Sequence, residues 1–247
     1  MPAWGAAPTS FVLNLFFAGQ LWWLNIAPGS DLPYWSICYE VWYYTIFGLI
    51  LFGGVYRVLA ATGAALIAGP NIIALFPLWL LGVLTYRICA RQRFSPWTGG
   101  ALVTISLVTW MAWEVLARRY HLQHIGPMYW VQRDQLPKDY IISTLFAAHL
   151  IGFVAISQFA LPVLERFARL IRWAAGATFT IYLLHWPVAQ FLTTVVPWEP
   201  DAWQTRVVMF PGVLLIVFSA AACTERRKAA WRAVFASCLG QTKTPAI

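Results

Sequence analysis

The chain has 247 residues, of which 60% are hydrophobic and only 11% charged, and its mean hydropathy is +0.65. Soluble domains average about 25% charged residues, so this composition argues against a soluble protein and indicates an all-α integral membrane protein with several helices. The formal net charge of +8 does not indicate nucleic-acid binding, because the basic residues form short clusters between apolar runs; the anionic headgroups of membrane lipids are sufficient partners.

Apolar runs follow one another along the chain, and we predict that about eight of them cross the membrane as a polytopic helix bundle. The runs cover residues 11–27, 35–54, 56–69, 71–88, 100–117, 140–161, 176–196 and 206–223. The third run is weak and ends at Gly69-Pro70, so it is re-entrant, steeply tilted or incompletely spanning. We expect one membrane domain over residues 1–224 and a basic tail over residues 225–247.

The basic residues predict an orientation for this bundle. With the amino terminus inside, most of the 17 lysines and arginines lie at cytoplasmic helix ends, and the outer ends carry most of the acidic residues. We therefore expect both termini in the cytoplasm and the long polar connection 118–139 outside. The tail is either an amphipathic helix on the inner leaflet, which uses Trp231 and Phe235, or a solvated end.

Glu40 is the most informative residue of the second run. A carboxylate at the membrane centre costs about 2.5–3.5 kcal/mol on insertion scales, so such a residue usually has a partner or a function. Ser36, Glu40, Tyr43 and Phe47 recur at helical spacing and share one face. The pattern fits a general acid or base, and it equally fits a protonated glutamate that is hydrogen-bonded to a neighbouring helix.

His185 lies in the middle of the seventh run. Thr178, Tyr182 and His185 share a helix face, and Pro187 frees a backbone carbonyl one turn earlier. His185 is either a hydrogen-bonded packing residue or one wall of a polar cavity.

A second histidine, His149 in the sixth run, has a depth similar to that of His185. The pair could ligate haem iron, but two histidines alone are weak evidence for a haem site. The four cysteines have no metal-ligand spacing and no legible disulfide pattern, so we expect buried, small apolar residues and no bound metal. Serine-hydrolase, phosphate-loop and zinc-hydrolase motifs are absent from the sequence.

Three segments carry a family resemblance. Residues 35–44, WSICYEVWYY, resemble the W-S-L-x-x-E-x-x-F-Y signature of the membrane-bound acyltransferase-3 family, and the preceding stretch 13–33 resembles its lead-in. Residues 178–187, TFTIYLLHWP, resemble the family's S-Y-x-I-Y-L-L-H-W-P segment. Glu225-Arg226 resembles the closing E-R-P, with Arg227 in place of the proline.

The resemblance implies an enzyme of the bacterial inner membrane. Members of the family move an acyl group from cytoplasmic acyl-CoA to a hydroxyl of a glycan, so we expect acetyl-CoA as co-substrate, no bound cofactor, and a glycan or lipid-linked sugar as acceptor. Family members usually begin with further helices that carry an Arg, a His thought to be the catalytic base, and a basic R-x-x-R element. Nothing before Phe11 matches them, so a partner that supplies those helices is a further expectation.

The resemblance and the polar helix faces together predict the site. Glu40 and His185 are expected to be catalytic and to line one wet pocket. The expected substrate-binding residues are Trp35, Ser36, Tyr43, Tyr44, Tyr182 and Trp186. The alternative is a non-catalytic protein, either a transporter or a helper subunit for a lipid or glycan. A transporter should show two related halves, and the sequence shows none.

Overall fold

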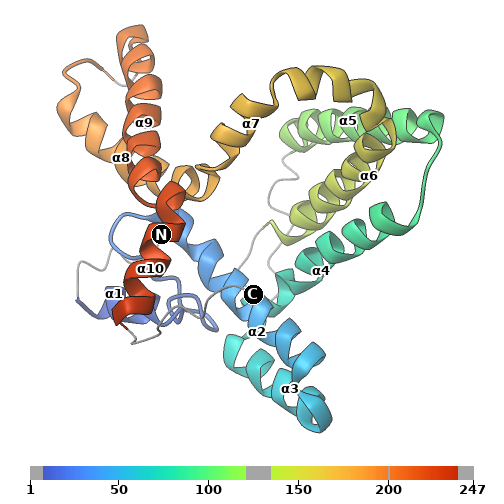
Figure 1. The fold of residues 1–247 in the computed structure, drawn as a ribbon, viewed down its shortest axis with the longest axis horizontal. Helices are drawn as coiled ribbons and strands as arrows, with labels where there is room; N and C mark the ends of the chain where they lie inside the picture. The colour runs from blue at the N-terminus through green and yellow to red at the C-terminus, as the bar shows by residue number, and fades with distance from the viewer. Residues whose placement is uncertain (1–7, 121–134, 200, 239–247) are drawn as a thin grey trace. The chain divides into compact units, whose positions relative to one another are not determined.

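The computed structural model describes residues 8–120, 135–199 and 201–238, and every regular element in these ranges is helical (Figure 1). The elements are α1 (Pro8–Leu15), η1 (Leu32–Tyr34), α2 (Trp35–Phe52), η2 (Gly54–Tyr56), α3 (Arg57–Ala68), α4 (Pro70–Arg91), α5 (Pro96–Arg119), α6 (Leu136–Arg166), α7 (Ala168–Ala175), α8 (Thr178–Val195), α9 (Trp203–Cys223), η4 (Glu225–Arg227) and α10 (Lys228–Cys238). The all-α prediction is confirmed for the part of the chain that these ranges cover. Most of the predicted outer connection lies outside them.

Five helical stretches within the described ranges are long and apolar enough to cross a membrane, which identifies an integral membrane protein. They are Leu32–Phe52, Pro70–Arg91, Pro96–Arg119, Leu136–Arg166 and Trp203–Cys238. Three of the eight predicted spans are not among them. α3 has only 12 residues, as its weak run suggested, and polar residues such as His185 lower the hydropathy of α8.

The first predicted span, 11–27, is wrong as a membrane-crossing helix. α1 ends at Leu15 after 8 residues, a rise of about 12 Å, and the backbone turns at Phe17 and Trp22, which both have a φ of 55°. Side chains satisfy backbone carbonyls of this segment: Asn14 Nδ2 donates to Ile26 O at 3.1 Å and Asn71 Nδ2 to Trp22 O at 2.7 Å. An apolar run can therefore stay non-helical, because neighbouring elements satisfy its polar backbone.

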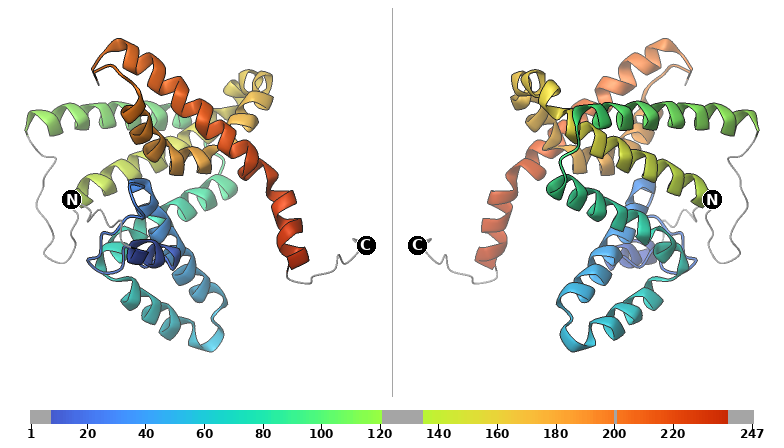
Figure 2. Two further views of the ribbon diagram at one scale, coloured as in Figure 1. Left: turned by 90° about the vertical axis from the view of Figure 1, so that its left-hand side faces the viewer. Right: turned by 90° about the vertical axis from the view of Figure 1, so that its right-hand side faces the viewer.

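The described residues fall into two compact units. Unit 1 comprises residues 1–27 and 35–166, and unit 2 comprises residues 28–34 and 167–247. Unit 1 contains α1 to α6, and unit 2 contains η1 and α7 to α10. Figure 2 gives two further views of these elements.

The core of unit 1 forms where α2, α3 and α4 pack together. Its buried side chains are Tyr39, Tyr43, Ile46, Ala61, Ala64, Ala68, Ile72 and Leu75. α3 contributes only alanines to this set, and such small side chains let helices approach closely in a membrane. The large rings of α2 therefore pack across the space towards α4, which positions the aromatic wall described below.

α5 and α6 run side by side in unit 1, as both figures show, and their contact depends on two glycines. A Cβ at Gly152 would lie 2.7 Å from Gly99 O, and one at Gly99 would lie 2.7 Å from the Cβ of Ala155. At the other end of this pair, Lys138 Nζ lies 3.7 Å from Glu114 Oε1. The ion pair agrees with the expectation that these two charged residues lie at the same end of the bundle.

The helices of unit 2 are connected by Glu225, which belongs to one of the three family-like segments. Its carboxylate accepts hydrogen bonds from Thr180 N at 3.2 Å and from Thr180 Oγ1 at 2.9 Å, at the start of α8. A negative charge at a helix amino terminus satisfies free N–H groups and is favoured by the helix dipole. Arg226 donates to Trp173 O at 3.1 Å and lies 4.3 Å above the centre of the Trp173 ring.

The tail forms a helix, α10, in which the rings of Trp231 and Phe235 lie 6.5 Å apart. A helix is compatible with both alternatives for the tail, the amphipathic helix on the inner leaflet and the solvated end, so both stay open. The expectation that all cysteines are buried is wrong for Cys223 and Cys238, which are exposed, and Cys89 is half-buried.

Candidate functional site

A cleft of about 420 Å³ lies in unit 1 between α2, α4 and α6. It brings together residues from three helices that are far apart in the sequence. Its lining residues are Trp35, Ser36, Tyr39, Glu40, Tyr43, Leu75, Leu78, Trp79, Asp139 and Ser143. Four of the predicted site residues, Trp35, Ser36, Glu40 and Tyr43, are thus on one cleft wall.

Aromatic rings form the wall between α2 and α4. Trp35 and Tyr39 meet edge to face with centroids 5.1 Å apart, and Tyr39 meets Tyr43 in the same way at 6.2 Å. Tyr43 in turn packs 5.5 Å from Phe76 and 6.2 Å from Trp79 on α4. Such edge-to-face packing holds each ring in a defined orientation, so the wall is rigid.

Glu40 lies on the exposed side of α2, at the rim of the cleft. Tyr44, one helical turn later, donates a hydrogen bond from its hydroxyl to Glu40 Oε1 at 3.0 Å. Tyr44 does not line the cleft, so its position fits a residue that orients the carboxylate better than one that touches a substrate. Of the two readings of Glu40, a hydrogen bond to a neighbouring helix is not observed among the described residues, and the partner Tyr44 is on the same helix.

Asp139 and Ser143 are cleft residues that the sequence reasoning missed. They lie on α6 at spacing i, i+4, so both face the cleft. Asp139 was interpreted only as part of the outer charge balance. The overlooked signal was a carboxyl and a hydroxyl on one face at the start of a spanning run. With Glu40, Asp139 gives the cleft two carboxylates.

Unit 2 holds the second group of predicted residues, around His185. His185 Nδ1 lies 3.0 Å from Ile181 O and 2.8 Å from Tyr182 O. Both partners can only accept, so Nδ1 carries a hydrogen, and in the neutral imidazole the free lone pair is then on Nε2. The Tyr182 hydroxyl donates to Pro33 O at 3.1 Å, which links α8 to η1, and Trp186 is partly exposed.

Asp31 is the acidic neighbour of His185, and the sequence reasoning did not select it either. Burial raises the pKa of Asp31 from 3.8 to about 6, against the attraction of His185 and a hydrogen bond from the backbone of Tyr34, which both lower it. No hydrogen-bond partner within the described residues reaches Asp31 Oδ1. Unit 2 therefore contains a carboxyl group and an imidazole that interact electrostatically.

Glu40 belongs to unit 1 and His185 to unit 2, so the expected pocket shared by the two residues stays a prediction. The haem alternative is likewise untested. His149, in unit 1, has Ser106 Oγ of α5 at 3.1 Å from its Nδ1. Among the described residues, no cluster of three or more His, Cys, Asp or Glu side chains could hold a metal ion.

Comparisons of the chain with protein-family models, with curated proteins and with solved structures found no match. The resemblance to the acyltransferase-3 family therefore depends on the quoted motifs alone. The structure adds one relation between them: Glu225 of the third segment binds Thr180 of the second.

Proposed function

We propose that this chain acts as a membrane O-acyltransferase, which moves an acyl group, acetyl in the simplest case, from acyl-CoA to a hydroxyl of a glycan. The observation that carries the proposal is the cleft of unit 1. It presents two carboxylates, two serine hydroxyls and an aromatic wall on spanning helices, and the motif-bearing segment 35–44 supplies half of it.

The lining of the cleft suits a sugar. Carboxylates accept hydrogen bonds from hydroxyl groups, and charge-assisted bonds of this kind are roughly twice as strong as neutral ones. The rings of Trp35 and Trp79 offer flat apolar faces to the C–H groups of a pyranose. A volume of about 420 Å³ lies within the range of small-molecule sites and has room for one or two sugar rings.

The proposed reaction needs a base near the acceptor hydroxyl. The hydroxyl oxygen attacks the thioester carbonyl carbon as Glu40 takes the hydroxyl proton. The C–S bond then breaks, the acyl group stays on the sugar oxygen, and the thiolate of coenzyme A leaves and takes up the proton. Tyr44 orients Glu40, and Asp139 with Ser36 holds the neighbouring hydroxyls. His185, with Nε2 as acceptor, is the second candidate base.

We further propose that the protein resides in the inner membrane of a bacterium, with the end of α4 and the tail in the cytoplasm. The expected cytoplasmic amino terminus required the run 11–27 to cross as a helix, which it does not. The support is the charge distribution: arginines cluster at the end of α4 and around α7 and η4, and the outer ends carry most acids. Acyl-CoA is cytoplasmic. The Glu40 cleft is lined by the first half of α4, away from the arginines at its end, so this orientation places the cleft towards the opposite face, where a glycan acceptor is met.

The test is an acyl-transfer assay with the chain in lipid nanodiscs, using labelled acetyl-CoA and a panel of glycans, together with mass spectrometry of glycans from cells with and without the gene. Loss of O-acyl groups in cells without the gene supports the proposal. If the glycans are unchanged and the purified chain transfers no acyl group, the proposed function is wrong. Transfer that returns only when a second membrane protein is added would favour the helper-subunit alternative.

A further inference from the structure

A polar hollow of about 430 Å³ lies in unit 1 at the end of α4, where the chain turns into α5 beside α6. Gln92 and Arg93, which follow α4, and Gln158 on α6 bring N–H donors to its wall. Ile151 and Phe94 add apolar surface next to these donors. Arginine and amide donors in such an arrangement suit a phosphate group that is attached to an apolar body.

The charge around the hollow is positive. Arg87, Arg91 and Arg93 lie in the last turns of α4 or just after it, and residues 41–113 contain no Asp or Glu. Neither ion pair found among the described residues involves Arg93. The acid on α6 at this end is Glu165, about two helical turns beyond the last residue of that helix that lines the hollow. The hollow therefore favours an anionic ligand.

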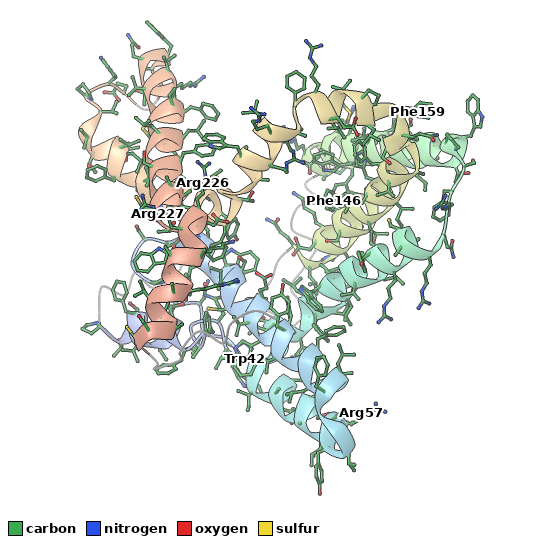
Figure 3. All side chains as sticks on the ribbon, in the orientation of Figure 1. Trp42, Arg57, Phe146, Phe159, Arg226 and Arg227 are labelled. Atoms are coloured by element: carbon green, nitrogen blue, oxygen red, sulfur yellow. The ribbon has the colours of Figure 1, made fainter. Side chains whose placement is uncertain are left out.

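An apolar groove of about 860 Å³ continues from the hollow between α4 and α6. Cys89 and Val154 line both the hollow and the groove. Phe146, which is labelled in Figure 3, forms part of the α6 wall further along. Thr85 also lines the groove, but its hydroxyl donates to Leu81 O at 2.7 Å and so does not need a polar ligand. The groove favours an apolar occupant, so one ligand can place an anionic end in the hollow and an apolar end in the groove.

The direction and the length of the groove correspond to those of a lipid tail. The groove starts at the basic end of α4, and its α4 wall reaches Trp79. From Cys89 back to Trp79 the helix rises about 15 Å at 1.5 Å per residue. One leaflet is half of the hydrocarbon thickness of about 30 Å, which is also about 15 Å. Since the arginines mark the membrane surface, a tail that starts at the hollow reaches the middle of the bilayer near Trp79.

We propose that the hollow and the groove together bind one anionic glycerophospholipid from the leaflet at the basic end of α4. Its phosphate lies against Arg93, and one of its acyl chains runs along the groove towards Trp79. Basic pockets between membrane helices bind anionic headgroups in this way. The proposal depends on the membrane character of the chain and on the charge at the end of α4, so it stands apart from the proposed acyl transfer.

Coenzyme A also carries phosphate groups, but its arm fits the groove less well than an alkyl chain. The arm contains two amide groups, and burying an amide without a hydrogen-bond partner is unfavourable. The hydroxyl of Thr85 in the groove already donates to its own helix. An alkyl chain has no such requirement and gains from leaving water.

Cys89 reports on the occupant, because it is half-buried where the hollow and the groove meet. The full chain is placed in phosphatidylcholine nanodiscs in which a growing share of the lipid is replaced by phosphatidylglycerol. Peptide mass spectrometry measures the rate at which N-ethylmaleimide alkylates Cys89. The exposed Cys223 and Cys238, which lie outside unit 1, report any general effect of the surface charge. Native mass spectrometry counts the lipids that stay bound after transfer to detergent.

We expect phosphatidylglycerol to slow the alkylation of Cys89 several-fold relative to Cys223 and Cys238, and one phosphatidylglycerol to stay bound in detergent. Arg93→Gln should weaken this binding about five-fold, the effect of one basic residue near an anionic headgroup. The matched control is Arg57→Gln, which removes the same charge from unit 1. Arg57 is exposed, like Arg93, but does not line the hollow, and it is labelled in Figure 3.

The groove is tested separately from the hollow. Gly82→Trp places a ring in the groove, because a Cβ at Gly82 meets no atom within 4 Å, and it should abolish the protection of Cys89 by phosphatidylglycerol. Gly100→Trp is its control, since Gly100 on α5 is equally open but does not line the groove.

Four outcomes overturn the proposal. Equal protection in pure phosphatidylcholine would assign the groove to membrane lipid in general. Equal protection by soluble glycerol phosphate or coenzyme A, added to phosphatidylcholine nanodiscs, would make the hollow a site for a free phosphate compound. An equal loss in Arg57→Gln and Arg93→Gln would reduce the effect to general surface charge. Protection that survives Gly82→Trp would place the acyl chain outside the groove.

Discussion

Glu40 and His185 are both ionisable residues on apolar helices, yet the two units hold them in different ways. Glu40 lies at the rim of a cleft that three helices of unit 1 build, and its hydrogen-bond partner Tyr44 is on its own helix. His185 donates back to carbonyls of α8, and Asp31 is its electrostatic neighbour in unit 2. Unit 1 thus offers a place for a substrate, and unit 2 offers an imidazole whose tautomer is fixed.

The largest expected effect concerns Glu40. Glu40→Gln keeps the shape and a hydrogen bond from Tyr44 but cannot take a proton, so we expect acyl transfer to fall by about 10²–10⁴. Tyr44→Phe should cost much less, because it removes only the orienting bond. Initial rates in nanodiscs measure both. If His185→Gln lowers the rate and Glu40→Gln does not, the base belongs to unit 2 and the assignment to Glu40 is wrong.

The frame of unit 1 is tested at Gly152. A larger side chain there forces α5 and α6 apart, because a Cβ would already lie 2.7 Å from Gly99 O. Overpacking of this kind costs about 1–3 kcal/mol, so Gly152→Leu should lower the midpoint of thermal unfolding. Gly100→Leu, on the open side of α5, is the control. An equal loss in both variants would mean that helix propensity and lipid exposure, rather than the contact, set the effect.

The frame of unit 2 is tested at Glu225. Glu225→Gln can keep a hydrogen bond to Thr180 but loses the charge at the start of α8, and we expect a loss of about 0.3–1 kcal/mol. Glu225→Ala should cost more, because it also leaves the backbone N–H of Thr180 unsatisfied. Hydrogen exchange of the amides in the first turn of α8 reports this locally. Faster exchange throughout unit 1 as well would show that the residue is not a local cap.

The sequence predicted the long apolar helices well, but it did not predict where the backbone leaves the helical conformation. The sequence predicted the spans that correspond to α2, α4, α5, α6 and α9, because a long apolar helix is recognised from the hydropathy of its own residues. The run 11–27 looked similar but is broken at two residues that make contacts with residues distant in sequence. Phe17 O accepts from Trp42 Nε1, and Trp22 contacts Asn71 and the backbone of Gly69. No local pattern encodes such contacts.

The sequence predicted only part of the candidate site, for the same reason. Periodicity placed Ser36, Glu40 and Tyr43 on one face of α2, and Tyr182 and His185 on one face of α8, since helical spacing is a local property. Asp139 joins the cleft only through the packing of α6 against α4, where Tyr140 donates to Ala74 O at 2.7 Å. Asp31 reaches the neighbourhood of His185 through the bond from Tyr182 to Pro33. Both carboxyl groups therefore required tertiary structure to be found.

The smallest expected effect is a pH dependence in unit 2. Because the folded pKa of Asp31 is about 6 and its ordinary value is 3.8, the folded unit keeps this proton over a range in which the unfolded chain has lost it. Unit 2 should therefore lose some stability as the pH rises from about 4 to about 6 and change little above that. Asp31→Asn should flatten this slope in thermal unfolding, whereas Asp201→Asn, at an exposed carboxyl, should not. A slope that survives Asp31→Asn would assign the titration to another group. Because His185 opposes the shift, His185→Gln should extend the loss of stability to higher pH.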